Sequence, residues 1–253
     1  MHVLVCASRK GGGGKTVCAR HLGVAAMLAG NKVAIVDLDP MAGLTGWWRR
    51  RAEDALELID LTPDGMPKDT PDQRHAASLA AAGMFAGAIP RLTKAGGHDI
   101  LIVDTPPAPD RIVSMAIGSV DLVIVPVRPS PDDLDPVGET VDLATAAKKP
   151  MVFVVNSATR KANLTSDAAI ALSQHGTVSP AILHRADAYA SSALDGRTVS
   201  ETDPKGKPAG DVAALWAYVG KRLGLQACKH AGSESGRTAS KVVRRKAKAA
   251  HGA

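Results

Sequence analysis

Short apolar runs rich in β-branched residues recur along the chain and end in polar residues. They read HVLVCAS, KVAIVDLD, HDILIVD, DLVIVPV and MVFVVN, at 2–8, 32–39, 98–104, 121–127 and 151–156. The runs are continuously apolar rather than alternating, which is typical of strands that are buried on both faces of a parallel sheet. Two weaker runs, 56–61 and 177–183, are further strand candidates.

Helical stretches separate these runs. One covers 16–29 and ends at Gly30 and Asn31, and another covers 109–118. The alternation of strands and helices predicts a doubly wound α/β fold, with a mostly parallel sheet and helices on both faces. Ligands of such folds bind outside the carboxyl ends of the strands, so functional side chains are expected just after each run.

The chain divides into one large domain and a basic tail. Its 253 residues, 45% of them apolar, can build a substantial core. Residues 62–75 contain prolines and charges and predict a surface loop, whereas 208–224 predicts a helix that closes a domain spanning 1–225. The tail, 226–253, has few bulky apolar residues and is expected to be disordered when unbound.

All of the net charge of +6 lies near the C-terminus. The segment 229–253 holds seven Lys or Arg residues and one Glu, so the rest of the chain carries 24 basic and 24 acidic residues. A flexible basic segment suits sequence-independent DNA binding, and a merely solubilising tail is the alternative. The possible DNA contacts are Lys221, Arg222, Lys241, Arg244, Arg245, Lys246 and Lys248.

The cysteines and the hydropathy pattern indicate a cytoplasmic protein. Cys6, Cys18 and Cys228 lie far apart with no paired spacing, which argues for a reducing compartment and against a disulfide framework or a zinc site. No apolar stretch approaches the roughly 18 residues that a membrane span requires.

The segment RKGGGGKT, Arg9 to Thr16, lies between the first strand and the first helix. A phosphate-binding loop needs glycines that let backbone N–H groups point at the anion, and it must lie at a helix N-terminus. Gly14, Lys15 and Thr16 match the end of the pattern G-x-x-x-x-G-K-[ST], but Arg9 stands at the first glycine position. A glycine-rich turn that only joins a strand to a helix is the alternative.

With Lys10 included, the loop has the deviant form K-G-G-x-G-K-[ST], and the chain resembles the ParA/MinD family of ATPases that carries it. VAIVDLDPMAGLTGWW at 33–48 is similar to that family's D-x-D-P strand and first switch, and DILIVDTPPAPD at 99–110 to its Walker B strand and second switch. Similar segments at 120–134, 154–156 and 185–201 continue in the family's order. The resemblance covers about 1–224, is to the small ParA type, and implies a P-loop NTPase of the deviant Walker A class.

The resemblance implies that the chain binds ATP and Mg²⁺. Lys15 would neutralise the β- and γ-phosphates, and Thr16 would ligate Mg²⁺, with Asp104 acting through the water shell of the ion. Asp39 is the implied water-orienting carboxylate, although Asp37 lies on the same strand face and spacing alone does not separate the two. The implied nucleotide-binding residues are Lys10, Gly11, Gly12, Gly13, Gly14, Lys15, Thr16, Val17 and Asn156.

Two of these residues have competing interpretations. In the family that the chain resembles, the lysine at the position of Lys10 reaches the nucleotide of the other subunit. The resemblance therefore implies a catalytic set of Lys10, Lys15 and Asp39. The alternative for Lys10 is a solvated lysine beside the loop. Asn156 can present a donor and an acceptor to adenine, or it can be a simple strand-end turn residue. The role of Arg9 is left open, and Trp47 and Trp48 are expected to be packing anchors.

The function that the resemblance implies is that of a slow DNA partition or positioning ATPase, which dimerises on ATP and binds DNA non-specifically on the nucleoid. A ParB-type or other small DNA-binding adaptor would stimulate hydrolysis. The alternatives are a nucleotide-gated DNA-binding accessory protein, as in conjugative transfer, and a positioner of a non-DNA cargo. Membrane binding is not expected, because the end of the tail offers too little apolar area. An iron–sulfur carrier is not expected either, given where the cysteines lie.

Overall fold

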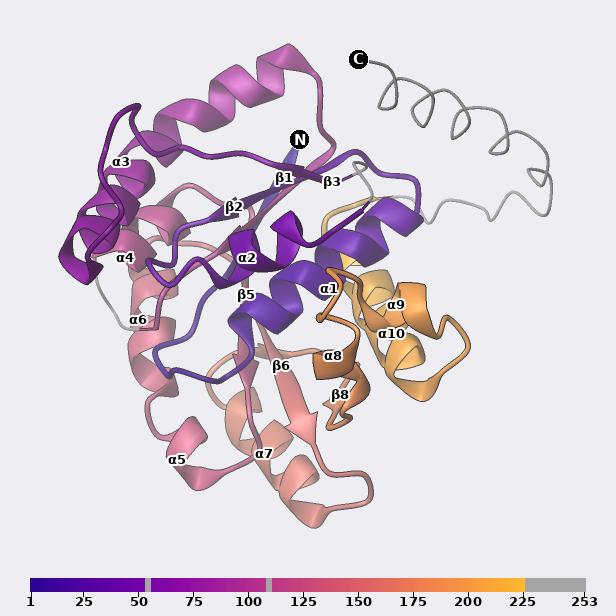
Figure 1. Ribbon diagram of the computed structural model, residues 1–253. Coiled ribbons are helices and arrows are strands. Elements are labelled where there is room, and N and C mark those ends of the chain that lie inside the picture. Colours follow the sequence, from indigo (N-terminus) through magenta and orange to yellow (C-terminus); the bar gives the residue numbers. More distant parts are fainter. Residues whose placement is uncertain (53–55, 108–110, 226–253) are drawn as a thin grey trace, which may run out of the picture.

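A parallel sheet forms the centre of the molecule (Figure 1). The computed structural model describes residues 1–52, 56–107 and 111–225. The strands are β1 His2–Cys6, β2 Val33–Asp37, β3 Leu56–Leu58, β4 Ile100–Asp104, β5 Leu122–Val127, β6 Met151–Ala158, β7 Thr177–Val178 and β8 Leu183–His184. Their order is β3-β2-β4-β1-β5-β6-β7, β8 pairs with β6, and the described pairings are all parallel.

Helices cover both faces of the sheet (Figure 1). One face carries α1 Lys15–Leu28, α2 Gly43–Arg49, α9 Val199–Thr202 and α10 Lys207–Arg222. The other carries α3 Pro71–Ala95, α4 Arg111–Gly118, α6 Val137–Ala146 and α7 Asn163–Ser173. The short helices α5 Pro131–Leu134 and α8 Ala188–Ser191 lie in connections. The predicted doubly wound fold is confirmed.

The continuous apolar runs are explained by the two cores. In β1, Leu4 and Cys6 pack against α1 and α10, whereas Val3 and Val5 face the helices on the opposite side. All four side chains are at most 2% exposed. A strand with apolar neighbours on both faces carries apolar side chains at successive positions, so a continuous apolar run indicates a central strand.

The prediction of a surface loop over 62–75 is wrong at its C-terminal end, because α3 begins at Pro71. Thr70 caps this helix: its hydroxyl accepts from the Gln73 N–H at 3.2 Å, and the Gln73 side chain accepts from the Thr70 N–H at 3.1 Å. Pro71 occupies the first turn, where its missing N–H costs nothing. The prolines and charges that suggested a loop are thus partly a helix start.

The two weak strand candidates are shorter than predicted. The run at 177–183 is two separate two-residue strands, β7 and β8, because Pro180 lies between them and cannot donate to a ladder. The run at 56–61 forms only β3, at the edge of the sheet. The predicted helix 109–118 is described only as α4, from Arg111 onward, and the predicted helices at 16–29 and 208–224 correspond to α1 and α10.

The C-terminal tail at 226–253, with five of the possible DNA contacts, lies outside the described residues. Within the described ranges, no helix combines the length and the apolar character needed to cross a bilayer.

Candidate active site

The strand order brings the singled-out segments to one edge of the sheet. The glycine loop follows β1, and β4, which ends in Asp104, is the direct neighbour of β1. Asp37, at the end of β2, is the register partner of Asp104. On the other side of β1 lies β5, and Asn156 belongs to the next strand, β6. Four strands thus contribute side chains to the same edge.

The glycine loop has the shape of an anion cradle. Gly14 has φ +104°, a conformation that only glycine adopts easily, and an added Cβ would collide with the Asn156 amide. Within the described residues, the backbone N–H groups of 11–17 donate to no protein acceptor, and the first helical bond there is from the Cys18 N–H to the Gly14 carbonyl at 2.8 Å. Free N–H groups at the start of α1, next to a lysine, fit a phosphate chain.

Lys15 is the buried cation of the loop. It is 6% exposed, and its Nζ donates to the Lys10 carbonyl oxygen at 3.1 Å. Burial lowers the pKa of Lys15, while the nearby carboxylates of Asp104 and Asp39 oppose that shift. The ammonium group therefore has negative charge nearby but only a neutral acceptor in direct contact, which suits a side chain that contacts phosphate.

Thr16 and Asp104 meet at the acidic side of the loop. The Thr16 hydroxyl donates to Asp104 Oδ2 at 2.6 Å, and Asp104 is fully buried. Burial, followed by the charge of Asp37, raises the pKa of Asp104 to about 8. A buried carboxyl group that ionises with difficulty favours a nearby cation.

The residues around Thr16 fit Mg²⁺ in the way this ion usually binds. No group of three or more His, Cys, Asp or Glu side chains able to hold a metal exists among the described residues. Mg²⁺ retains waters and binds through one or two protein oxygens plus substrate phosphates. The Thr16 hydroxyl would supply a direct ligand, and Asp104 an acceptor for the water shell.

The structure separates the two candidate carboxylates of the first switch. Both Asp37 oxygens are occupied, since Oδ1 accepts from the Asp39 N–H at 3.1 Å and Oδ2 from the Thr45 N–H at 2.8 Å. Asp39 uses Oδ1 for the Met41 N–H at 2.9 Å. Asp37 therefore holds the backbone that leads into α2, whereas Asp39 has a second carboxylate oxygen with no partner among the described residues.

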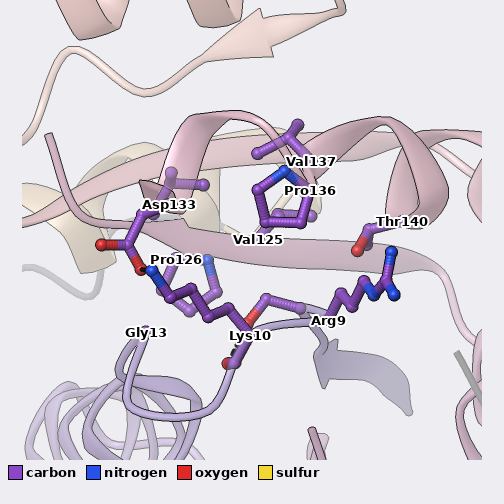
Figure 2. Close-up of a pocket in the computed structure, with 11 residues that line it drawn as sticks. Arg9, Lys10, Gly13, Val125, Pro126, Asp133, Pro136, Val137 and Thr140 are labelled. Carbon is purple, nitrogen blue, oxygen red and sulfur yellow. Dashed lines mark hydrogen bonds and ion pairs between the residues drawn. The ribbon is translucent and has the colours of Figure 1, made fainter. Parts of the chain in front are cut away.

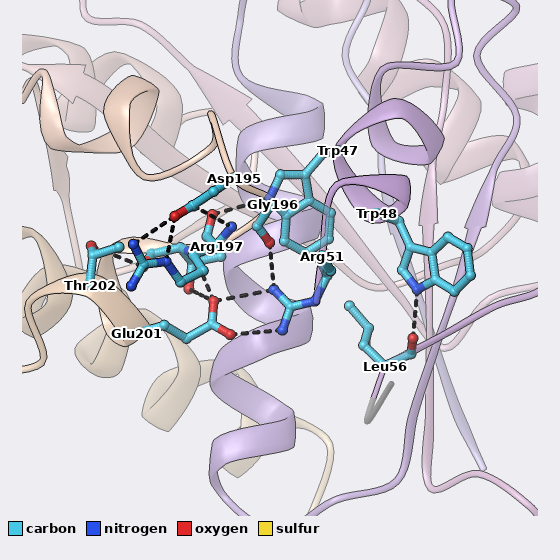
Figure 3. A network of polar contacts seen from close by, with 10 residues as sticks. Trp47, Trp48, Arg51, Leu56, Asp195, Gly196, Arg197, Glu201 and Thr202 are labelled. Atoms are coloured by element: carbon cyan, nitrogen blue, oxygen red, sulfur yellow. Dashed lines mark hydrogen bonds and ion pairs between the residues drawn. The ribbon is translucent and has the colours of Figure 1, made fainter. Parts of the chain in front are cut away.

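The helix after the switch is firmly anchored (Figure 3). Arg51 makes a two-point ion pair with Glu201, at 2.7 and 3.2 Å, and lies 5.0 Å from the centre of the Trp47 ring. The Trp47 indole donates to the Arg197 carbonyl at 3.1 Å, and the Trp48 indole donates to the Leu56 carbonyl at 2.6 Å. Both tryptophans are packing anchors, as predicted.

Lys10 and Arg9 bind carboxylates of the segment after β5. Figure 2 shows the Lys10 side chain directed toward Asp133, with Nζ 3.4 Å from Asp133 Oδ1 and 2.9 Å from the Asp132 carbonyl oxygen. Arg9 forms an ion pair with Glu139 of α6. Asp133 is 8% exposed and also accepts from the Ser130 hydroxyl at 2.5 Å. Lys10 is thus held by contacts within its own chain.

Asn156 braces the loop. Its side-chain amide donates to the Gly13 carbonyl at 2.8 Å, and the residue is 8% exposed. The simple turn interpretation is therefore insufficient, because the contact spans two strands. The amide oxygen has no partner among the described residues and is free to accept a hydrogen bond.

Some predicted residues lie away from this edge, and some important ones were not predicted. Lys221 and Arg222 are exposed at the end of α10, where Arg222 donates to the Tyr218 hydroxyl at 3.1 Å. Glu139 and Arg128 were not predicted. The sequence analysis could have considered Arg128, because it directly follows a strand.

Comparisons with known proteins agree with this geometry. The family model described as ATPase MipZ matches residues 2–170. A carboxysome distribution protein A from Gloeobacter kilaueensis is 28% identical over 225 residues, covering 87% of this chain and 93% of that protein. The chromosome-partitioning ATPase Soj of Thermus thermophilus is 31% identical over 139 residues, 49% of this chain and 54% of Soj. The Mg-ADP complex of MinD from Pyrococcus horikoshii has a TM-score of 0.71 at 19% identity, covering 88% of this chain and 97% of that one.

Proposed function

Because the chain belongs to the MipZ family of ATPases, within the ParA/MinD group, and hydrolyses ATP, we propose that it is a positioning or partition switch. ATP binding drives formation of a homodimer, the dimer binds DNA without sequence preference, and a small adaptor protein of the ParB type stimulates hydrolysis and release. Mg²⁺ and ATP are the cofactors, and the bacterial nucleoid is the surface on which the switch operates.

The observation that carries the ATPase site is the meeting of Thr16, Asp104 and the free N–H groups of the loop at one sheet edge. Lys15 supplies the charge for the β- and γ-phosphates, and Asp39 orients the attacking water molecule. Asn156 holds the Gly13 carbonyl with its amide nitrogen and offers its oxygen to the base. Asp39 and Asn156 each offer an oxygen with no partner among the described residues, and Lys15 contacts only a backbone oxygen.

The position of Lys10 supports the dimer step. Its Nζ is directed away from the cradle formed by its own loop and toward α5, and the side chain is 40% exposed. A lysine placed there reaches a partner's nucleotide more readily than its own. A γ-phosphate shared between Lys15 and the partner subunit's Lys10 would make the dimer depend on ATP rather than ADP.

A relative favours a second candidate function. The carboxysome distribution protein that matches 87% of this chain indicates that a chain of this size and organisation can position a protein assembly. In that case the dimer binds DNA in the same way, but its adaptor belongs to a cargo other than a replicon. Identification of the adjacent gene product, and its effect on ATP turnover, separates the two.

The test compares the wild type with Lys10→Ala and with Lys94→Ala, an exposed lysine of α3 that serves as a charge control. Light scattering is measured with ATP and with ADP, together with retention on nonspecific DNA. Wild type and Lys94→Ala should dimerise and bind DNA only with ATP, whereas Lys10→Ala should bind ATP as a monomer. A Lys10→Ala protein that still dimerises would refute the cross-subunit role, and DNA binding that ignores the nucleotide would refute the switch.

A further inference from the structure

One arginine lies directly against the phosphate loop without being part of it. Arg128 follows β5, the neighbour of β1 from which the loop starts. A Cβ placed on Gly12 would lie 3.3 Å from Nη2, 3.7 Å from Cζ and 3.8 Å from Nη1 of Arg128. Gly12 has φ +78° and lies in the middle of the glycine run. The guanidinium group therefore rests on the backbone of the cradle.

Arg128 is not committed to a carboxylate. Its side chain makes no ion pair or hydrogen bond with any residue that the structure describes and is exposed, while its backbone carbonyl accepts from the Ser130 N–H at 2.8 Å. The other cations beside the loop differ, because Arg9 pairs with Glu139 and Lys10 with Asp133. A guanidinium group carries five N–H donors and is always charged, so Arg128 can bind an anion without first giving up a partner.

The surroundings of Arg128 leave it room to turn. Together with Ser130, Asp133, Ser157, Thr159 and Arg185 it lines an open cavity of about 510 Å³. The hydroxyl groups there can hydrogen-bond a guanidinium group or its ligand, and the one acidic side chain of this lining, Asp133, is engaged by Lys10 and by the Ser130 hydroxyl. The second cation there, Arg185, adds to the preference for an anion.

The strand order fixes which side of the nucleotide Arg128 faces. Asp104 and Thr16 lie on the β4 side of β1, whereas Arg128 lies on the β5 side, between the loop and the strand that carries Asn156. In such loops the backbone N–H groups cradle the α- and β-phosphates, and the lysine reaches toward the γ-phosphate. Arg128 packs on the central glycines from the side of the loop where Asn156 lies, and it therefore faces the α- and β-phosphates.

Building on the proposed nucleotide site, we infer that Arg128 donates hydrogen bonds to the α- and β-phosphate oxygens of the nucleotide bound to its own subunit. A guanidinium fork matches two phosphate oxygens at once. ATP and ADP share these phosphates, so Arg128 contributes equally to the binding of both. This separates it from Lys10, whose contribution requires ATP and a second subunit.

The experiment measures the affinities of ADP, ATP and adenosine for wild type, Arg128→Gln and Arg128→Lys by competition with a fluorescent ADP analogue. Arg91→Gln, an exposed position on α3, controls for the loss of one positive charge. Arg128→Gln should bind ADP and ATP about tenfold or more weakly, the usual effect of losing a charge-assisted contact, with adenosine affinity unchanged. Arg128→Lys should be intermediate, and Arg91→Gln should match the wild type.

Three results would overturn the inference. Equal weakening of adenosine binding would mean that Arg128 only shapes the loop, and weakening confined to ATP would place it at the γ-phosphate. Unchanged ADP affinity in Arg128→Gln, with a wild type that binds ADP and a Lys15→Ala protein that does not, would remove Arg128 from the site. A wild type that binds neither ADP nor ATP would instead refute the nucleotide site itself.

Discussion

The two flanks of the phosphate loop balance their charges in opposite ways. On the β4 side, Asp37 and Asp104 are register neighbours at the ends of buried strands, and the charge of one raises the pKa of the other. On the β5 side, Arg9 and Lys10 each have a carboxylate partner from the segment after β5. The acidic flank is short of positive charge, whereas the two loop cations of the basic flank, Arg9 and Lys10, are already paired with carboxylates.

This difference determines which protein contacts a ligand must replace when it binds on either flank. A cation that enters the acidic flank stabilises the ionised form of Asp104, whose pKa burial and the charge of Asp37 raise to about 8. A phosphate that recruits Lys10 must replace Asp133. Because Lys10 is 40% exposed, its ion pair contributes only about 0–1 kcal/mol, and the exchange is therefore inexpensive.

Lys15→Ala has the largest expected effect on nucleotide binding, because this side chain lies between the two flanks. In Lys15→Ala the cradle keeps its N–H groups but loses its buried cation, and ATP and ADP affinity should fall by at least about 100-fold, since the loss of a buried charge partner costs several kcal/mol. Titration calorimetry measures this, with Lys94→Ala as the control. Near wild-type affinity would disprove the phosphate-loop assignment.

Asp104→Asn tests the acidic flank. The amide keeps an oxygen for the Thr16 hydroxyl and replaces a carboxyl group whose ionisation is opposed in the folded state by burial and by Asp37. The nucleotide-free protein should therefore melt at a higher temperature than the wild type above about pH 4, where the unfolded chain ionises this group. The gain in ATP affinity on adding Mg²⁺ should shrink about 10–100-fold, as for other residues that act through a metal's water shell.

Thermal melts with and without MgATP, set against removal of Mg²⁺ by EDTA, measure both effects. Asp142→Asn, an exposed carboxylate on α6, is the matched control. A lower melting temperature together with an unchanged Mg²⁺ effect would show that Asp104 is a structural carboxylate with no part in metal binding.

The acidic flank could be predicted from the sequence better than the basic one. Asp37, Asp39 and Asp104 end continuous apolar runs, and such runs identify central strands without any knowledge of their neighbours. The loop lysines follow in the same way from a strand–glycine–helix order. Spacing left open which of Asp37 and Asp39 is engaged by backbone N–H groups on both oxygens, because the contact from the Thr45 N–H to Asp37 depends on how the chain turns into α2.

The basic flank depends on contacts between distant segments. Lys10 and Asp133 are joined only because β5 lies next to β1, and the Arg9–Glu139 pair has the same origin. Sequence spacing does not contain this information. The start of α3 is a different kind of miss, because T-P-D-Q from Thr70 to Gln73 is a recognisable capping sequence that proline and charge content obscured.

Asp133→Asn tests the exchange on the basic flank and has the smallest expected effect. Without the carboxylate, Lys10 is released more easily, so the ATP concentration for half-maximal dimer formation should fall about twofold to fivefold, in line with an ion pair of up to about 1 kcal/mol whose lysine is exposed to solvent. Sedimentation velocity across an ATP titration measures this concentration.

Asp132→Asn is the matched control, because Lys10 contacts only the backbone oxygen of Asp132. A higher ATP requirement in Asp133→Asn would contradict this and would mean that Asp133 orients Lys10 toward the partner's nucleotide. The basic flank would then bind its ligand without first losing an ion pair, as the acidic flank does.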